Sequence, residues 1–314
     1  MNKGLILVGE PMGLLIAQTE GTLDTVSGYS LAVAGAELNV AIGASRLGHK
    51  VTYMTKLGND PFGKRIVHLL SESNIGSEFV SFSDTRPTGF MLKGRTSHGD
   101  PDIFYFRKGS AASTLDENDV AKIDMTKYSH IHLTGILPAL SEECKRASFK
   151  LMEMAKEHGL FISFDPNLRP QLWKSTEEMA ATLNKLAAYA DLVLPGQAEG
   201  KILMGSDNAS DINNFYLQNG AKICVTKCGS DGAFVSTQDE SFMVHGYKVK
   251  HVVDTVGAGD GFATGVITGL MEGLSLKEAV TRGNAIGAIQ VMSRGDNEGL
   301  PTPDKLNAFF AENK

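Results

Sequence analysis

Residues 254–262, which read DTVGAGDGF, put a glycine turn and a carboxylate at the start of an apolar run. Gly257 and Gly259 lack a Cβ, so the amides of this turn can converge on one anion. A helix over 260–272 would add the partial positive charge of its N-terminus, which suits a phosphoryl group in transfer. Asp260 in the first turn of that helix fits two roles, a helix cap or the base that takes a proton from an attacking hydroxyl.

The pattern Asp-Thr-x-Gly-Ala-Gly-Asp resembles the C-terminal signature of the ribokinase-like (PfkB) carbohydrate kinases. The resemblance implies that Asp260 is the catalytic base and that Gly257, Ala258 and Gly259 form an anion hole. It also implies an α/β three-layer sandwich, with a mostly parallel central sheet, helices on both faces and a small β-sheet lid. ATP and Mg²⁺ are the implied cofactors.

A second signature lies near the N-terminus, at residues 34–41 (AGAELNVA). By residue type alone it is a glycine turn followed by a helix, with Asn39 as a polar residue in the first turn. It also resembles the N-terminal signature of the same kinases, in which the glycine and the asparagine contact sugar hydroxyls. The resemblance therefore implies that Gly35 and Asn39 bind the substrate.

A third stretch, residues 164–173 (FDPNLRPQLW), follows an apolar run that predicts a strand. Ligands of open α/β sheets bind beyond the carboxyl ends of the strands, so Arg169 is well placed for substrate, although it could equally be a surface residue between two prolines. Asp-Pro-Asn-x-Arg-x-x-Leu-Trp resembles the matching segment of both fructokinases and 2-keto-3-deoxygluconate kinases. It narrows the substrate without deciding it.

The metal sites are implied less directly. Many relatives carry Asn-x-x-Glu after the strand expected at 191–194, and this chain has Gly196 in place of the Asn. Glu199 can still act on magnesium through water, because magnesium keeps several waters in most sites; otherwise it is an exposed residue at a helix start. Asp254 and the carbonyl of Val256 correspond to a potassium site in some relatives.

Residues 225–233 (VTKCGSDGA) read as a strand, a glycine turn and a second strand, which alone indicates only a hairpin. In the resembled kinases this turn lies along the nucleotide, which implies ATP contacts for Lys227, Gly229 and Gly232. Asn284 matches a position near the adenine, although an Asn in a helix is more often only solvated.

Two other nucleotide-binding patterns are not met. Residues 58–64 (GNDPFGK) match most of a phosphate loop, but Arg65 replaces the Ser or Thr that would hold magnesium, and Pro61 suits the first turn of a helix. A dinucleotide G-x-G-x-x-G is absent after the strand expected at 5–8, which disfavours a nicotinamide oxidoreductase.

Composition limits the partners and the compartment. Hydrophobic residues make up 42% and charged residues 21% of the 314 residues, which is ordinary for a globular protein with a sizeable core. The net charge of −6 and the lack of a basic block argue against a nucleic-acid or membrane partner. Three cysteines without a complete zinc ligand set suit a reducing environment, so we expect a cytoplasmic protein.

Short β-branched runs alternate with helical periodicity, which is typical of a parallel sheet covered by helices on both faces. We expect strands at 5–8, 51–56, 130–134, 160–165, 191–194, 222–226 and 232–236. We expect helices at 37–48, 61–73, 141–158, 175–189, 260–272, 275–292 and 303–312. Glycines at four-residue spacing in the helix over 260–272 predict close packing of its backbone against the sheet. No linker divides the chain, so we expect one domain over 1–314.

Two segments, about 11–34 and 88–107, interrupt this alternation, and we expect them to form a lid sheet with a turn at 96–101 (TSHGDP). The period of two puts the side chains of strand 103–107 on opposite faces: Ile103, Tyr105 and Arg107 on one, Phe104 and Phe106 on the other. In the resembled family such a lid covers the sugar and often forms the dimer contact. We therefore expect lid closure over the substrate and a homo-oligomer.

The arginines point to a substrate class. A sugar acid brings a carboxylate that must be neutralised, and the planar fork of arginine suits it. Arg107 beside Tyr105 and Arg169 are the candidates. Together with Asp296, in the loop after helix 275–292, they make the chain more similar to 2-keto-3-deoxygluconate kinases than to fructokinases, although Asp296 could equally be a solvated loop residue.

The expected function is therefore ATP-dependent phosphorylation of the terminal hydroxyl of 2-keto-3-deoxygluconate. Fructose or another neutral sugar is the alternative substrate. A binding protein that keeps the fold without transferring phosphate is a further alternative, but the intact Asp260 and glycine turn argue against it.

Overall fold

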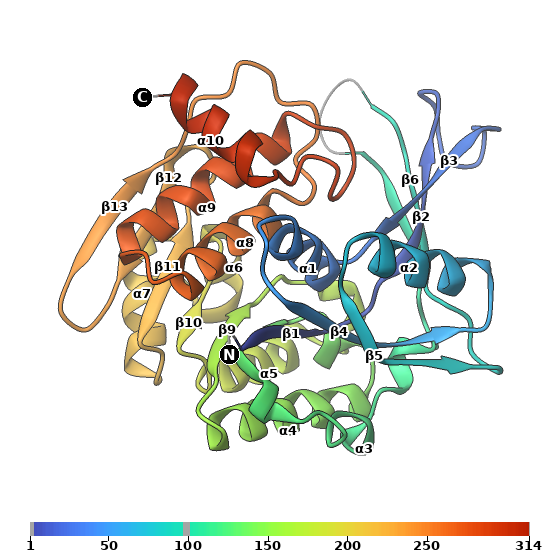
Figure 1. Cartoon of the computed structure of the whole chain (residues 1–314), viewed down its shortest axis with the longest axis horizontal. Coiled ribbons are helices and arrows are strands. Elements are labelled where there is room, and N and C mark those ends of the chain that lie inside the picture. The colour runs from blue at the N-terminus through green and yellow to red at the C-terminus, as the bar shows by residue number, and fades with distance from the viewer. Residues whose placement is uncertain (1–2, 97–100, 314) are drawn as a thin grey trace.

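The computed structural model, which describes residues 3–96 and 101–313, is built on a nine-stranded sheet with helices on both faces (Figure 1). The strand order is β13-β12-β11-β10-β9-β8-β1-β4-β5, parallel throughout except for the two antiparallel pairings of β12. The strands are β1 (Gly4–Val8), β4 (Val51–Gly58), β5 (Gly76–Ser83), β8 (Tyr128–Thr134), β9 (Phe161–Asp165), β10 (Leu192–Val193), β11 (Ile223–Lys227), β12 (Gly232–Ser236) and β13 (Ser241–His245).

Alternate residues of the strands enter two separate cores, as the period of two requires. In β1, Ile6 and Val8 pack with one set of helices, whereas Leu5 and Leu7 pack with the other. The first set is α3 (Glu117–Val120), α4 (Glu142–Glu157), α5 (Thr176–Ala187), α6 (Gln197–Met204) and α7 (Ala209–Gln218). The second is α1 (Ala36–Arg46), α2 (Pro61–Glu72), α8 (Ala258–Met271), α9 (Leu276–Val291) and α10 (Pro303–Glu312). Of the helices described, none is long and apolar enough to cross a membrane.

The lid is a separate sheet of order β3-β2-β6-β7, seen at the upper right of Figure 1. Its strands are β2 (Met12–Ala17), β3 (Tyr29–Ala34), β6 (Phe90–Lys93) and β7 (Ile103–Phe106). Both expected segments contribute two strands each, and their inner face has a small apolar core that includes Leu14 and Met91. The turn expected at 96–101 lies partly outside the described residues.

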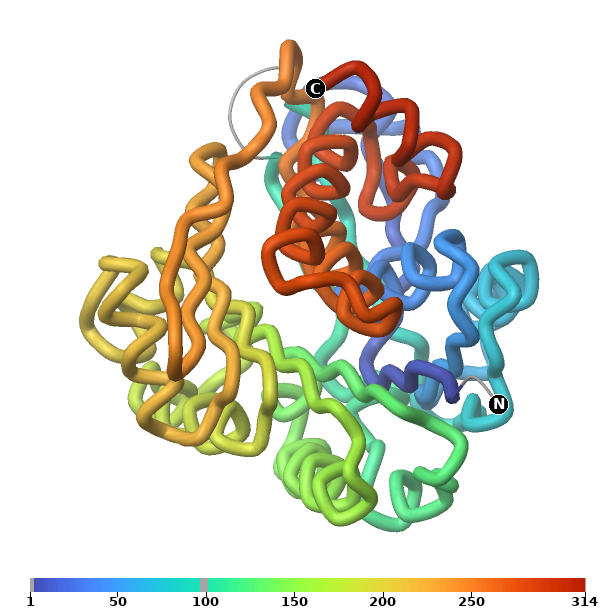
Figure 2. Tube along the Cα trace, turned by 60° about the vertical axis from the view of Figure 1, so that its left-hand side comes forward, coloured from blue at the N-terminus to red at the C-terminus, as the bar shows by residue number. Residues whose placement is uncertain are grey.

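The loop after α9 ties the C-terminal part of the chain to its beginning. Arg46 at the end of α1 donates to the carbonyls of Asn297 and Leu300, and the Asn297 amide donates to the carbonyl of Val33. Figure 2 shows these distant segments, blue and red, side by side. The residues after α9 are thereby held against the lid strand β3 and against α1.

All the expected strands and helices of the main sheet are present, with ends within two residues of those expected. The strands β5 and β13 and the helices α3, α6 and α7 were not expected. β5 is a half-exposed edge strand in which polar residues are mixed with apolar ones, so it lacks the apolar run of a buried parallel strand.

The expected packing of the glycine-rich helix against the sheet is wrong. A Cβ on Gly265 of α8 would lie 2.6 Å from the Cα of Gly283, and one on Gly269 would lie 2.8 Å from the Cα of Ala279. Both neighbours belong to α9, so the glycines allow two helices, rather than a helix and the sheet, to approach closely. This packing fixes α8, whose N-terminus faces the site described next.

Candidate active site

A cavity of about 580 Å³ lies between the lid and the carboxyl edge of the main sheet. Glu10, Asn167 and Lys227 line it from the ends of β1, β9 and β11, and the lid covers it with Met91, Ile103 and Tyr105. All six residues predicted to bind substrate lie on its wall: Gly35, Asn39, Tyr105, Arg107, Arg169 and Asp296. The predicted split of the strand 103–107 is also found, because the side chains of Phe104 and Phe106 are about half exposed on the other face of the lid.

The glycine turn forms the end of this cavity where α8 begins. Gly257 is the residue before the helix and has φ 79°, and a Cβ there would lie 2.2 Å from the carbonyl oxygen of Asp296. Only glycine fits this position without moving the neighbouring loop. Among the described residues, the amides of Gly259 and Asp260 have no hydrogen-bond acceptor, so they are available to an anion at the helix N-terminus.

Asp260 is the third residue of α8, and its carboxylate does not cap the helix. The side-chain amide of Asn39 donates to Oδ2 at 2.8 Å, and that of Asn167 approaches Oδ1 at 3.5 Å. Burial raises the pKa of Asp260 to about 6, with Asn39 opposing the shift and Asp165 adding to it. An acid of this pKa is ionised at neutral pH and is a stronger base than an ordinary aspartate.

A second cavity, of about 370 Å³, meets the first at Lys227 and Gly259. All four residues predicted to bind the nucleotide line it: Lys227, Gly229, Gly232 and Asn284. Gly232 has φ 109°, and a Cβ there would lie 2.1 Å from the carbonyl oxygen of Val244. Asn284 is buried rather than solvated, since its amide donates to the carbonyls of Val244 and His245 at 3.0 and 3.1 Å and holds β13 against α9.

Three charged residues, Asp165, Glu199 and Lys227, form what we call the sheet-side cluster. The Lys227 ammonium lies 2.5 Å from Asp165 Oδ2. Burial favours the neutral amine, but Asp165 and Glu199 outweigh it, so the pKa of Lys227 is raised. β9 and β11 are separated only by β10, so the register of the sheet brings these groups together.

Glu199 is not an exposed helix-start residue. Its Oε1 accepts from the amide of Leu168 at 2.9 Å, and its Oε2 accepts from the amide of Gly196 at 2.7 Å. Burial raises the pKa of Glu199, while Lys227 opposes the shift. Because both oxygens already accept from amides, this carboxylate fits an indirect contact to magnesium through water better than direct coordination.

On the other side of the cavity, Arg107 is paired with Glu10. Arg107 Nε and Nη2 lie 2.7 and 2.5 Å from Glu10 Oε2, and the Ser110 hydroxyl donates to the other oxygen. The guanidinium also lies 5.5 Å from the centre of the Tyr105 ring. Arg107 is therefore neutralised and held in one orientation, and only its remaining N–H groups face the cavity.

Lys93 lines a neighbouring pocket together with Asp254 and reaches Asp296 on the wall of this cavity. Its ammonium lies 2.6 Å from Asp254 Oδ2 and 3.5 Å from Asp296 Oδ1. Burial raises the pKa of Asp296 to about 6, and Lys93 opposes the shift. We call Glu10, Lys93, Arg107, Asp254 and Asp296 the lid-side cluster.

Arg169 differs from Arg107. Its Nη1 donates to the carbonyl of Leu168 at 2.8 Å and approaches that of Asn167 at 3.5 Å. In the described part of the chain no carboxylate forms an ion pair with Arg169, so its other N–H groups are available to a ligand. It is the better placed of the two arginines to neutralise a negative charge.

The family model of the pfkB carbohydrate kinases matches residues 2–303. This chain belongs to that family. The kinase is 44% identical to the 2-dehydro-3-deoxygluconokinase of Bacillus subtilis (strain 168), over 99% of this chain and 96% of the relative. It is 32% identical to the 2-dehydro-3-deoxygluconokinase of Thermoproteus tenax, over 95% and 91%, and 30% identical to a probable chloroplastic fructokinase of Arabidopsis thaliana, over 96% and 81%.

Solved structures agree with this assignment of the kinase. A PfkB protein from Polaromonas sp. JS666 superposes with a TM-score of 0.89 at 41% identity and covers 98% of this chain and 99% of its own. An E. coli protein assigned as ribokinase II, in complex with ATP and Mg²⁺, superposes with a TM-score of 0.89 at 26% identity and covers 99% of each chain. The ribokinase-like fold with its lid is thereby confirmed.

Sequence reasoning missed Glu10, Lys93 and Asn167 of the kinase. Glu10 follows the end of β1, so the rule that singled out Arg169 would have found it. Asn167 was part of a quoted motif to which only the arginine was assigned. Lys93 shares the inner face of β6 with Met91, and a lysine at a core position of a strand is a signal of its own.

Proposed function

We propose that this kinase transfers the γ-phosphoryl group of ATP to the terminal hydroxyl of 2-keto-3-deoxygluconate and produces its 6-phosphate. The observation that carries the proposal is the 44% identity, over nearly the whole chain, to a kinase of that sugar acid, whose other name is 2-dehydro-3-deoxygluconate. Fructose is the second candidate, because fructokinases are among the relatives at about 30% identity.

In the proposed reaction Asp260 takes the proton of the terminal hydroxyl. The hydroxyl oxygen forms a bond to the γ-phosphorus while the bond to the β–γ bridging oxygen breaks, and ADP leaves with that electron pair. The amides of Gly259 and Asp260, the N-terminus of α8 and the Lys227 ammonium stabilise the charge on the transferred group. The lid excludes water, which would otherwise hydrolyse ATP.

ATP would occupy the 370 Å³ cavity beside Gly229, Gly232 and Asn284, with its phosphates toward Lys227. Magnesium would neutralise the phosphates. The described residues contain no cluster of three or more acidic, His or Cys side chains able to hold a metal, which favours a magnesium carried by the nucleotide and contacted by Glu199 through water.

The carboxylate of the sugar acid would lie against Arg169, whose free N–H groups face the larger cavity. Arg107, already oriented by Glu10, would add a further N–H, and Asp296 would accept from a sugar hydroxyl. Gly35 and Asn39 line the same cavity and would contact the sugar itself.

A substrate panel of neutral sugars, aldonic acids and keto-deoxy acids tests this proposal. We expect 2-keto-3-deoxygluconate to have the highest kcat/KM. Arg169→Ala should lower that kcat/KM by a factor equivalent to a loss of roughly 2–5 kcal/mol in transition-state binding energy. It should lower kcat/KM for neutral sugars far less. Arg146→Ala, which removes an exposed arginine on α4, is the matched control. A wild-type preference for fructose, or equal losses for both substrate types, would reject the sugar acid.

The outer face of the lid supports a dimer. Leu31, Phe104 and Phe106 are 46–56% exposed there, and such apolar clusters commonly mark protein contacts. We expect light scattering to show a dimer for the wild-type protein and a folded monomer for Phe104→Ser; a wild-type monomer at all concentrations would contradict this. The compartment we propose is the cytoplasm, consistent with three free cysteines.

A further inference from the structure

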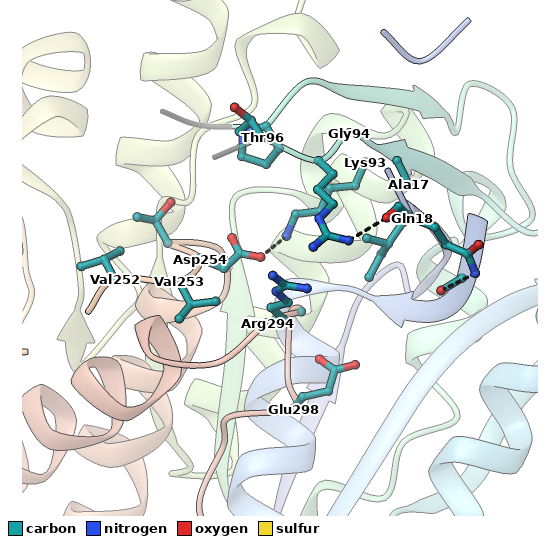
Figure 3. A pocket seen from close by; sticks show the side chains of 16 residues that line it. Ala17, Gln18, Lys93, Gly94, Thr96, Val252, Val253, Asp254, Arg294 and Glu298 are labelled. Carbon is teal, nitrogen blue, oxygen red and sulfur yellow. Dashed lines mark hydrogen bonds and ion pairs between the residues drawn. The ribbon is translucent and has the colours of Figure 1, made fainter. Parts of the chain in front are cut away.

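The Lys93 ammonium is buried between two acids that do not belong to the lid. Figure 3 shows the Lys93 side chain reaching from β6 to Asp254, in the loop before α8. Its side chain is 4% exposed, and the carboxylates of Asp254 and Asp296 are 12% and 6% exposed. A buried ammonium is costly unless it is paired, and here two acids converge on one cation.

Asp254 transmits this contact to the anion hole. Its Oδ2 accepts from Lys93, and its Oδ1 accepts from the backbone amide of Val256 at 3.1 Å. Val256 is followed directly by Gly257, the residue that starts the anion-hole turn. Through Asp254, the Lys93 ammonium therefore helps to position the amides that would hold the transferred phosphoryl group.

The oxygens implied as potassium ligands already have donors from the protein. Besides Lys93 on Asp254, the side-chain amide of Gln290 donates to the carbonyl of Val256 at 3.3 Å and to that of Gly295 at 2.8 Å. A metal cation needs several oxygen lone pairs at once, and a donor N–H directed at the same oxygens competes with it. The residues present thus do not fit a potassium ion at this place.

This group of three charges, Lys93, Asp254 and Asp296, also contributes little to stability by itself. Burying two carboxylates and an ammonium costs desolvation energy that their attraction only partly returns, and apolar side chains of the same volume would often do as well. A lysine at this position, on a strand whose other inward residue is Met91, is better explained by the need for one positive charge at a fixed point.

We propose that Lys93 is the built-in monovalent cation of this kinase. Its ammonium has the charge and about the size of a potassium ion, and it positions the loop through Asp254 and Val256, so phosphoryl transfer does not require potassium. Lys93 is a positioning residue that does not touch the reacting atoms. The proposal rests on phosphoryl transfer at Asp260, but not on which sugar accepts the phosphate.

The wild-type protein gives the first test. Initial rates are measured with KCl, NH₄Cl, NaCl and tetramethylammonium chloride at one ionic strength, with ATP and the best acceptor of the substrate panel. We expect rates within about twofold of one another, since the cation is part of the chain. Activation by potassium of about tenfold or more would overturn the proposal.

The second test removes the cation. Lys93→Ala should lose roughly 10- to 100-fold in kcat in tetramethylammonium and should recover most of it in KCl or NH₄Cl, which a merely structural loss would not do. Lys93→Gln, which keeps most of the side-chain length, serves if the alanine variant does not fold. Arg294→Ala is the control, because Arg294 lines the pocket drawn in Figure 3 together with Lys93 and Asp254 but has no ion pair among the described residues. A folded Lys93 variant whose lost activity no monovalent cation restores would overturn the proposal.

A third measurement needs no substrate, so it stays informative even if the proposed substrate is wrong. Potassium that binds the folded variant raises its unfolding temperature by mass action. We expect KCl, compared with tetramethylammonium chloride, to raise the unfolding temperature of Lys93→Ala or Lys93→Gln and to leave that of the wild type unchanged. A shift of the wild type as large as that of the variant would show that Lys93 does not occupy the cation position.

Discussion

The two charged clusters that flank Asp260 are built in different ways. In the sheet-side cluster Asp165 and Lys227 lie at the carboxyl ends of β9 and β11, and Glu199 lies in the first turn of α6, the helix that follows β10, so the main sheet fixes their spacing. In the lid-side cluster Lys93 and Arg107 belong to the lid, whereas their partners Glu10, Asp254 and Asp296 lie outside its strands. The sheet-side cluster is therefore intact in any position of the lid. The lid-side cluster forms only when the lid is in the position seen here.

Because of this difference, we expect the sheet-side cluster to affect mainly the free energy of unfolding and the lid-side cluster mainly the free energy of lid closure. Loss of Lys227 leaves the Asp165 carboxylate, which is 2% exposed, without its cation whether the lid is open or closed, so it lowers the free energy of unfolding. Loss of a lid cation leaves carboxylates that water can reach once the lid opens. The loss in free energy of unfolding then cannot exceed the free energy of opening the lid, and the variant mainly destabilises the closed, reactive conformation relative to the open one.

Removing Asp260, which lies between the clusters, should have the largest effect. Asp260→Asn should lower kcat by about 10²–10⁴ because the amide cannot take the proton of the hydroxyl, while KM for the sugar changes little. The same group should give the wild type an acid limb, with kcat/KM falling as the pH drops below about 6 and the base becomes protonated.

The control for this variant is Asp304→Asn, which removes an exposed acid from the first turn of α10 and should leave kcat unchanged. Near-normal turnover by Asp260→Asn would exclude the base assignment. An acid limb that persists unchanged in a variant with residual activity would assign that limb to another group, with Asp296 the next candidate.

The residues close to Asp260 were largely predictable from the sequence. The anion-binding turn at Gly257 and Gly259 follows from residue types, and Arg169 was placed by the rule for ligands of open α/β sheets. The roles of Asp260 as base and of Asn39 were implied by the resemblance to the kinase family. Local patterns of this kind are set by the chain's own geometry. A turn or a helix start depends mainly on neighbouring residues, so it can be predicted without knowing the long-range contacts.

The ion pairs were not predictable, because each joins residues far apart in sequence. Glu10 and Arg107 are 97 residues apart, and Lys93 and Asp254 are 161 apart. Without the register of the lid on the main sheet, Arg107 looks like a free cation awaiting a carboxylate. Its pairing with Glu10 moves most of the expected carboxylate recognition to Arg169.

The clusters themselves can be compared through their lysines. Lys227→Met should lower the free energy of unfolding by about 3–5 kcal/mol, because Asp165 is only 2% exposed and stays buried without a partner. Lys93→Gln should cost clearly less, since the lid can open and let water reach Asp254. Urea unfolding of both variants without ligands measures the difference.

Lys222→Met is the matched control for a surface pair near the same strand. Lys222 contacts Asp191 at 2.7 Å, but its side chain is 76% exposed, so the loss should be under about 1 kcal/mol. Equal destabilisation by Lys227→Met and Lys93→Gln would remove the distinction between a fixed cluster and one that depends on the lid.

Glu37 provides a third case, a buried acid without a cation, and the smallest expected effect. It is 0% exposed on α1; its Oε1 accepts from the Thr134 hydroxyl at 2.5 Å, and among the described residues its Oε2 has no partner. Burial raises the pKa of Glu37 from 4.5 to about 7. The folded protein therefore loses stability as the pH rises from about 4.5 to about 7, because the unfolded chain gives up this proton first, and the loss is complete once the folded group has ionised as well.

Glu37→Gln removes that ionisation while keeping the shape of the side chain. We expect the variant to be more stable than the wild type by about 1–3 kcal/mol at pH 9, and the gain to shrink as the pH falls from 7 toward 4.5, where the wild-type carboxyl is neutral in both states. Urea unfolding at several pH values measures this, with the exposed Glu72→Gln expected to change stability by less than about 0.5 kcal/mol throughout. A gain that does not depend on pH would mean that packing, not charge, distinguishes the variant, and Glu37 would then be compensated at high pH by a cation of the kind that Lys93 and Lys227 supply to their own acids.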